Sequence, residues 1–168
     1  MKKSGILLLS IALLLIFTVA SLLARDDQDI SFEHYFDKAK ITIDYNLIPF
    51  DSTKEEFLLK IQNHPIYFST NKDLLIDGSH LKAGSYSLWI ECKSSSWKII
   101  FNTSSKNYFS FKSNSRKINS DYLKVELPVI PLLDESNQFS VYFKNTNGFT
   151  LMYIQAANIS VALPISIK

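Results

Sequence analysis

Apolar and polar residues alternate with a period of two in the middle of the chain. Residues 86–91 place tyrosine, leucine and isoleucine at alternate positions, with serine, tryptophan and glutamate between them. This period puts the two sets on opposite faces of a β-strand. A polar run at 93–96 separates it from a second alternating segment, 97–102. Two such segments around a short polar connection predict a β-hairpin.

A turn is predicted directly before this hairpin. Leu81, Ala83 and Gly84 lie where the chain can reverse direction. Glycine adopts positive φ without the Cβ clash that other residues meet. We therefore expect Gly84 to hold a turn conformation that a β-branched residue cannot adopt.

The rest of the chain repeats short segments rich in aromatic and β-branched residues, separated by Asn, Ser, Asp, Gly and Pro. Besides the hairpin, these segments are residues 41–45, 66–69, 74–76, 108–112, 122–127, 139–144, 150–154 and 159–167. Short strands at close spacing, without alternating helices, favour antiparallel over parallel architecture. The predicted fold is all-β, an antiparallel β-sandwich of about nine or ten strands.

One short helix is predicted between the first two strands of the domain. Ser52 is a candidate N-cap, and Glu55 follows three residues later as in a capping box. Phe57, Leu58 and Ile61 then fall on one face. Isolated helices of about ten residues are marginal, so this one must pack on the sheet.

The N-terminal segment is unlike the rest of the chain. Lys2 and Lys3 precede a run from Gly5 to Ala24 that has no charged residue, and Arg25 follows it. The run is an export signal. It is near the length that spans a bilayer, and small residues at 18–20 also offer a cleavage point, so an uncleaved anchor and a cleaved signal both remain open.

The predicted organisation has three parts. Residues 1–24 are a signal peptide or a signal-anchor transmembrane helix, residues 25–38 are a linker, and residues 39–168 are the β-sandwich domain. About 140 residues are enough for one domain with a single core. Either fate of the apolar run places this domain outside the cytoplasm, anchored to the cytoplasmic membrane or periplasmic or secreted.

Charge and reactive side chains exclude several classes of function. The net charge of +2 comes from Lys2 and Lys3, so the domain is balanced and has no footprint for nucleic acid. Cys92 is a single cysteine, which excludes an internal disulfide, and we interpret it as an inert, half-buried side chain.

No catalytic or metal-binding constellation is visible. His34, His64 and His80 are far apart and have no second ligand at metal spacing. The adjacent acidic pairs at 55–56 and 134–135 are interpreted as solvated, and no nucleophile elbow or phosphate loop is present. We predict no catalytic residues, no metal and no cofactor. Exposed aromatic rings that stack on sugars or partner side chains are the remaining lead, although most rings near the hairpin should be packing residues.

The turn and the hairpin contain a set of residues at defined spacing: Gly78, Leu81, Ala83, Gly84, Tyr86, Ser87, Leu88, Trp97 and Asn102. This set resembles the signature of the domain of unknown function 2911 family, whose members are bacterial and largely exported. Residues 161–165 resemble the closing strand of the family. The resemblance implies a β-sandwich over most of residues 40–165, with these motif residues in structural roles.

The chain departs from the family pattern before the signature. Members typically carry an Arg-Pro pair with a following Gly-Arg, and then a Trp-Arg-x-Gly-x-Asn tract. None of these polar groups occurs in residues 44–70, and the tryptophan usual before the last strand is replaced around 154–156. The chain is therefore identified as a divergent member, in which a polar site of typical members is lost or changed.

These observations favour a non-catalytic module that binds an unknown partner protein or small-molecule ligand in the bacterial cell envelope. It would contact the membrane through residues 5–24 if these stay uncleaved. The alternative is an envelope hydrolase or carbohydrate-active enzyme whose site residues are scattered in sequence. A concave pocket that contains two carboxylates or a His–carboxylate pair in contact would favour this alternative.

Overall fold

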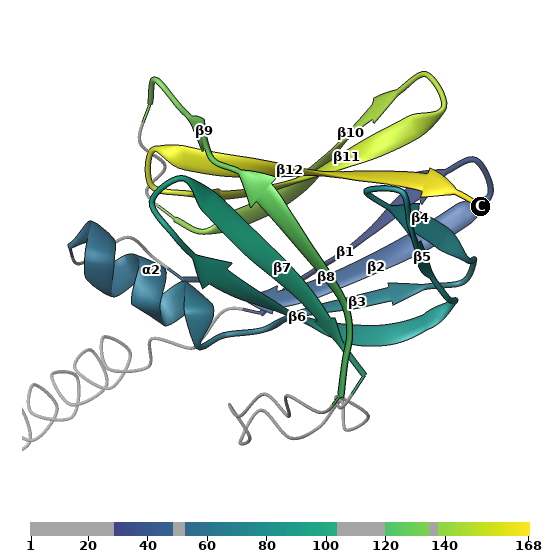
Figure 1. Ribbon diagram of the computed structural model, residues 1–168, viewed down its shortest axis with the longest axis horizontal. Coiled ribbons are helices and arrows are strands. Elements are labelled where there is room, and N and C mark those ends of the chain that lie inside the picture. Colours follow the sequence, from purple (N-terminus) through teal and green to yellow (C-terminus); the bar gives the residue numbers. More distant parts are fainter. Residues whose placement is uncertain (1–28, 49–52, 104–119, 135–137) are drawn as a thin grey trace, which may run out of the picture.

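The fold is mostly β. A computed structural model of the chain describes residues 29–48, 53–103, 120–134 and 138–168. These residues form twelve strands in two antiparallel sheets and one helix, α2 (Lys54–Gln62), as Figure 1 shows. The expected all-β, antiparallel class is confirmed, and the described residues contain more strands than the nine or ten predicted.

The first sheet has the strand order β1-β2-β3-β6-β7-β8. Its strands are β1 (Asp29–Phe36), β2 (Ala39–Asn46), β3 (Ile66–Thr70), β6 (Gly84–Cys92), β7 (Ser96–Asn102) and β8 (Asp121–Pro128). The predicted hairpin is β6 and β7, which pair from Ser87 opposite Asn102 to Cys92 opposite Trp97. The alternation in the sequence therefore identified this hairpin correctly.

The second sheet has the order β10-β11-β12-β4-β5, and β9 pairs with the other end of β12. Its strands are β4 (Leu74–Ile76), β5 (Ser79–Leu81), β9 (Ile130–Pro131), β10 (Ser140–Thr146), β11 (Phe149–Ala156) and β12 (Ile159–Ile167). Strands β5 and β9 were not predicted. The three-residue β4 is wholly apolar, whereas β5 of the same length begins with serine and histidine, and β9 has two residues, one of them a proline.

Strand β1 corrects the predicted linker over 25–38. Residues 29–36 pair with β2 along their whole length, from Asp29 opposite Asn46 to Phe36 opposite Ala39. The sequence DISFEHYF does alternate, but charged and polar groups occupy its exposed positions, and a histidine occupies one of its half-buried ones. Because its exposed positions are largely polar or charged, as is typical of an edge strand, β1 was interpreted as a linker.

Two predicted elements lie outside the described residues: the strand at 108–112 and the apolar run at 5–24. In the part of the chain that the structure describes, no helix is long and apolar enough to cross a membrane.

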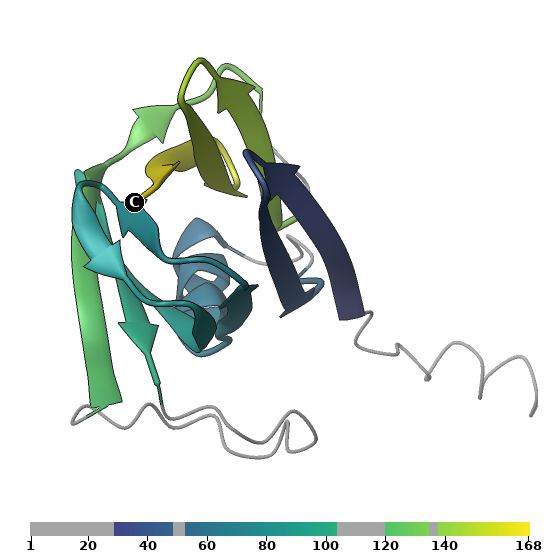
Figure 2. The same ribbon diagram turned by 90° about the vertical axis from the view of Figure 1, so that its right-hand side faces the viewer.

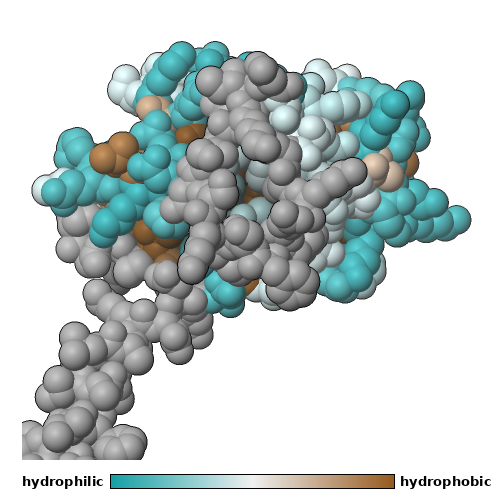
Figure 3. Space-filling model, turned by 90° about the horizontal axis from the view of Figure 1, so that it is seen from below, coloured by the Kyte–Doolittle hydropathy of each residue, from teal (hydrophilic) through white to brown (hydrophobic). Residues whose placement is uncertain are grey.

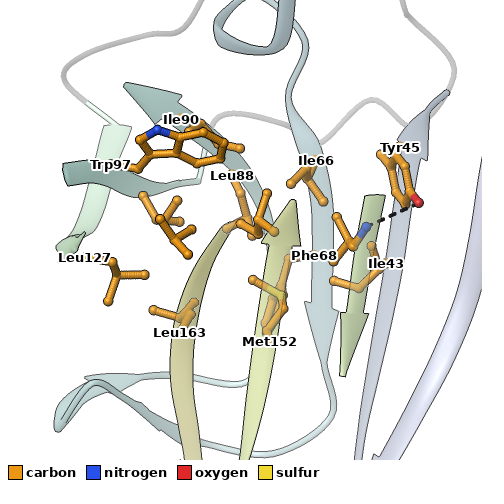
Figure 4. Packing of buried hydrophobic residues seen from close by; sticks show 14 of the residues in the cluster. Ile43, Tyr45, Ile66, Phe68, Leu88, Ile90, Trp97, Leu127, Met152 and Leu163 are labelled. Atoms are coloured by element: carbon orange, nitrogen blue, oxygen red, sulfur yellow. Dashed lines mark hydrogen bonds between the residues drawn. The ribbon is translucent and has the colours of Figure 1, made fainter. Parts of the chain in front are cut away.

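One hydrophobic core joins the two sheets. In Figure 4, Phe68 and Leu88 from the first sheet lie close to Met152 and Leu163 from the second, and all four are buried in the same cluster. Figure 2 shows strands of both sheets around this common interior. No disulfide contributes, because Cys92 is free, so apolar burial and backbone pairing hold the sheets together.

Helix α2 packs into the core through Phe57 and Ile61, as predicted. Its N-cap is Thr53, one residue after the predicted Ser52. The Thr53 side chain accepts a hydrogen bond from the backbone N–H of Glu56, whose carboxylate accepts from the Thr53 backbone N–H. The capping box therefore forms with the register shifted by one residue, which leaves Glu55 exposed in the first turn.

Gly84 opens β6 with φ of +155°, a conformation that side-chain-bearing residues rarely adopt. A Cβ at this position would lie in ordinary contact with the ring of Tyr86, at 3.7 Å from its hydroxyl oxygen. The constraint at Gly84 is therefore conformational rather than steric.

Replacing Gly84 by valine should lower the free energy of unfolding by about 1–3 kcal/mol, because valine must adopt this strained backbone conformation. The measurement is the thermal and urea unfolding of the Gly84→Val chain. Ser85→Val is the matched control, since the exposed next residue of the same strand favours a β-branched side chain. Equal melting of wild type and Gly84→Val would contradict the assigned backbone conformation.

Candidate functional site

Two hairpin turns and the C-terminal residue meet at the end of the molecule opposite α2. The turns are Asp37-Lys38, between β1 and β2, and Asn147-Gly148, between β10 and β11. Figure 1 shows both on the side of the C-terminus, with α2 on the other side. Asp37 and Lys38 both have positive φ, as a type I′ hairpin turn requires, and Gly148 also has positive φ. We call this the turn end.

Three open clefts run around the turn end. Their volumes are about 530, 470 and 390 Å³. The first and second share Asp37, and the second and third share Gly148 and Phe149. The clefts are therefore neighbouring parts of one surface, which we call the cleft band.

Asp73 is a charged residue that lines the largest of the three clefts. Its Oδ1 accepts a hydrogen bond from the backbone N–H of Ala83 at 2.9 Å, and its Oδ2 lies 2.9 Å from His80 Nε2. The Ala83 hydrogen bond, followed by the one from His80, lowers the pKa of Asp73 below its ordinary value. Asp73 is therefore an anion that holds the connection between β5 and β6 in place.

The second cleft lies where the edge strands of the two sheets meet. Tyr35, Phe36 and Asp37 of β1 and its turn line one side, and residues 145–149 line the other. Tyr35 is 60% exposed and Phe149 is 39% exposed. Aromatic rings at the surface of a cleft, next to the amides of Asn145 and Asn147, can bind a ligand by stacking and hydrogen bonding.

His34 lies beneath this cleft, at the line of contact between β1 and the β10–β11 hairpin, which we call the His34 seam. Its Nε2 donates to Asn145 Oδ1 at 2.9 Å and lies 3.1 Å from Thr150 Oγ1. Its ring stacks on Phe143 of β10, with centroids 4.2 Å apart and planes 4° apart. Burial lowers the pKa of His34 below 6.5, although the hydrogen bond with Asn145 opposes this shift. The neutral imidazole therefore links β1 to the β10–β11 hairpin.

The apolar signature residues lie in the core or beside it. Leu81, Leu88 and Trp97 are fully buried. Tyr86 packs edge-on against Phe101, and its hydroxyl donates to the Lys82 carbonyl at 2.8 Å. The remaining signature residues Gly78 and Ala83 line clefts of the cleft band, and Gly84 begins β6.

The polar signature residues Ser87 and Asn102 are opposite each other in the β6–β7 ladder. Both are buried, and Trp89 Nε1 donates to Ser87 Oγ at 3.1 Å. Asn102 Nδ2 donates to Asp121 Oδ1 at 2.9 Å. These contacts connect β6, β7 and β8 on the face of the first sheet away from the core, so the two residues belong to a buried polar network.

The other candidate residues are dispersed. Cys92 is partly buried, and burial raises its pKa to about 12, so its thiolate is suppressed. His64 follows α2, with its Nδ1 2.7 Å from the Lys60 carbonyl, and His80 lies in β5. The three histidines lie at separate places, and the described residues hold no cluster of three or more potential metal ligands.

The aromatic residues expected near the hairpin are packing residues: Tyr86, Trp89 and Trp97 are all buried. A different pair was missed, in which Tyr142 is 42% exposed and Tyr153 is half-buried. Tyr142 and Tyr153 are opposite each other in β10 and β11, and their rings stack with centroids 5.0 Å apart. The alternation along β10 and β11 places them on the outer face, but only the pairing register shows that they meet.

The fold and the cleft band define an all-β domain with an open surface of aromatic, amide and carboxylate groups at one end. The family model described as "Protein of unknown function (DUF2911)" matches residues 62–165, more than half of the chain. The chain therefore belongs to this family, as its signature indicated. No curated protein and no solved structure matched the chain.

The His34 seam should make stability fall in mild acid. The pKa of His34 is lowered in the folded state, so below pH 6.5 the unfolded chain takes up a proton that the folded chain resists. Urea unfolding at about pH 7.5 and about pH 5.5 should show a smaller acid loss for His34→Gln than for wild type. At the higher pH this variant should be about 1 kcal/mol less stable, because it loses the stacking on Phe143. An equal loss of stability in acid for both chains would contradict the partly buried, neutral His34.

Proposed function

We propose that the chain is a non-catalytic binding module of the bacterial cell envelope, exported by residues 5–24, and that its two sheets pack as a β-sandwich. The observation that supports a binding role most directly is the cleft band, where three adjoining clefts lie at one end of the fold. Because the signature residues largely form core and turns, ligand recognition in this divergent member would rely on the turn end.

The chemistry of the second and third clefts favours a saccharide as the ligand. Phe149 lines both of them, and its partly exposed ring offers a surface for stacking. Asn145, Thr146 and Asn147 place amide and hydroxyl groups beside this ring. Stacking on an aromatic face combined with neutral hydrogen-bonding groups suits a sugar ring, which has an apolar face and a rim of hydroxyls.

The test is isothermal titration calorimetry of the full chain with three probes: chitotriose, cellotriose and maltotriose. At least one should bind saturably, and Phe149→Ala should weaken it by up to about tenfold because the stacking surface is lost. Tyr142→Ala is the matched control, since Tyr142 of β10 is also an exposed aromatic ring but lines none of the three clefts. Absence of binding, or equal losses in the two variants, would contradict the proposed ligand site.

An envelope hydrolase is the second candidate, and two features favour it: Asp37 and Asp73 both line the largest cleft, and Asp73 contacts a histidine. His80 and Asp73 form a His–carboxylate pair, and Asp73 lines the largest cleft. His80 itself does not line this cleft, and the second oxygen of Asp73 is occupied by the Ala83 N–H. The pair therefore supports a structural role better than a catalytic one. Incubating the same trisaccharides with wild type and with His80→Ala distinguishes a structural role of the pair from a catalytic one. Hydrolysis of a trisaccharide by wild type but not by the variant would support the hydrolase.

A further inference from the structure

We infer that residues 5–24 remain as a membrane anchor and that the α2 end of the domain rests on the lipid surface. This inference rests on the proposed export. It adds the lipid bilayer as a binding partner of the folded domain, besides the ligand of the cleft band. The turn end would then point away from the membrane.

The first argument is where the chain joins the domain. Strand β1 begins at Asp29, which is opposite Asn46, the last residue of β2. The chain then runs from β2 towards α2, so β1 starts at the α2 end. Only residues 25–28 separate Ala24 from Asp29. An extended chain rises by at most about 3.6 Å per residue, so Asp29 lies within about 18 Å of the end of the apolar run.

The second argument is the apolar surface at this end. Leu59 of α2 is 58% exposed, Ile130 of β9 is 39% exposed and Leu133 is 105% exposed. Residues 129–133 read Val-Ile-Pro-Leu-Leu, a wholly apolar run. Ile130, Pro131 and Leu133 of this run are exposed together, and an exposed apolar patch marks a contact site. In Figure 3, which views the molecule from below, hydrophobic surface is visible at the left-hand, α2 side.

These residues belong to one rigid end of the fold. Asn158, in the turn between β11 and β12, accepts a hydrogen bond from Lys54 Nζ through its side chain and one from the Leu132 N–H through its carbonyl, both at 2.8 Å. Helix α2 and the segment after β9 are therefore tied to the same turn. Figure 1 shows α2 and β9 on the same side of the molecule.

The charges at this end favour hydrophobic insertion over attraction to anionic lipid. Helix α2 carries Lys54 and Lys60 but also Glu55 and Glu56, so its net charge is zero. A surface that binds anionic headgroups would instead carry an excess of lysine and arginine. An uncharged phosphatidylcholine bilayer should therefore suffice.

The test uses the full chain in phosphatidylcholine vesicles with a nitroxide label at Leu133→Cys, or at Leu59→Cys on the neighbouring element. Asn147→Cys, at the turn end, is the matched control. Cys92 should stay unlabelled because burial raises its pKa to about 12. Collision rates with oxygen, which partitions into lipid, and with a water-soluble nickel chelate report the surroundings of each label. The oxygen-to-nickel ratio should be shifted towards oxygen at 133 and 59, and towards nickel at 147.

Three results would overturn the inference. A mature chain that begins near Ser21 or Arg25, by intact mass, would remove the anchor. Nickel accessibility at 133 equal to that at 147, in a chain that resists carbonate extraction, would remove the lipid contact alone. Spin–spin broadening at 133 that disappears on dilution with unlabelled chain would assign the surface to a second copy. None of these readouts depends on saccharide binding. A failure of the saccharide proposal can therefore be distinguished from a failure of the lipid contact.

Discussion

The pairing of β1 with β2 is the interaction on which the other features depend. Eight residue pairs place β1 at the edge of the first sheet, where it faces β10 at the edge of the second. The direction of β1 fixes both ends of the domain: its first residue lies at the α2 end, and its last leads into the Asp37-Lys38 turn. The second cleft exists only because β1 supplies Tyr35 and Phe36.

Separate contacts, rather than a continuous backbone ladder, join the two sheets along this edge. At one end of the seam, His34 stacks on Phe143 and bonds to Asn145. At the other, the Val141 N–H donates to the Tyr45 hydroxyl at 3.4 Å, a contact drawn in Figure 4. A neutral, partly buried histidine makes such a seam sensitive to mild acid, whereas the apolar core behind it is not. The second cleft is therefore supported by polar contacts at both ends of the His34 seam, each of which contributes a modest free energy.

The sequence predicted the elements whose pattern is local. The alternation in β6 and β7 and the apolar face of α2 are properties of neighbouring residues, so periodicity identified them. It could not identify β1, whose charged outer positions imitate a linker, and it placed the N-cap at Ser52 although Thr53 forms the capping box. The cleft band escaped prediction for a different reason. Asp73, Phe149 and Lys168 come from segments far apart in sequence. Only the strand topology places them in neighbouring clefts.

Amide hydrogen exchange of the full chain tests the placement of β1 most directly. In an antiparallel edge strand, alternate N–H groups point to the neighbouring strand and the others to solvent. Within residues 29–36, the account therefore predicts that about half of the amides are protected as strongly as those of β2, in alternation with fast-exchanging ones. Uniformly fast exchange from residue 29 to residue 36 would show that this segment is a linker. The second cleft, the contacts of His34 with β10 and the proposed orientation of the domain would then lose their structural basis.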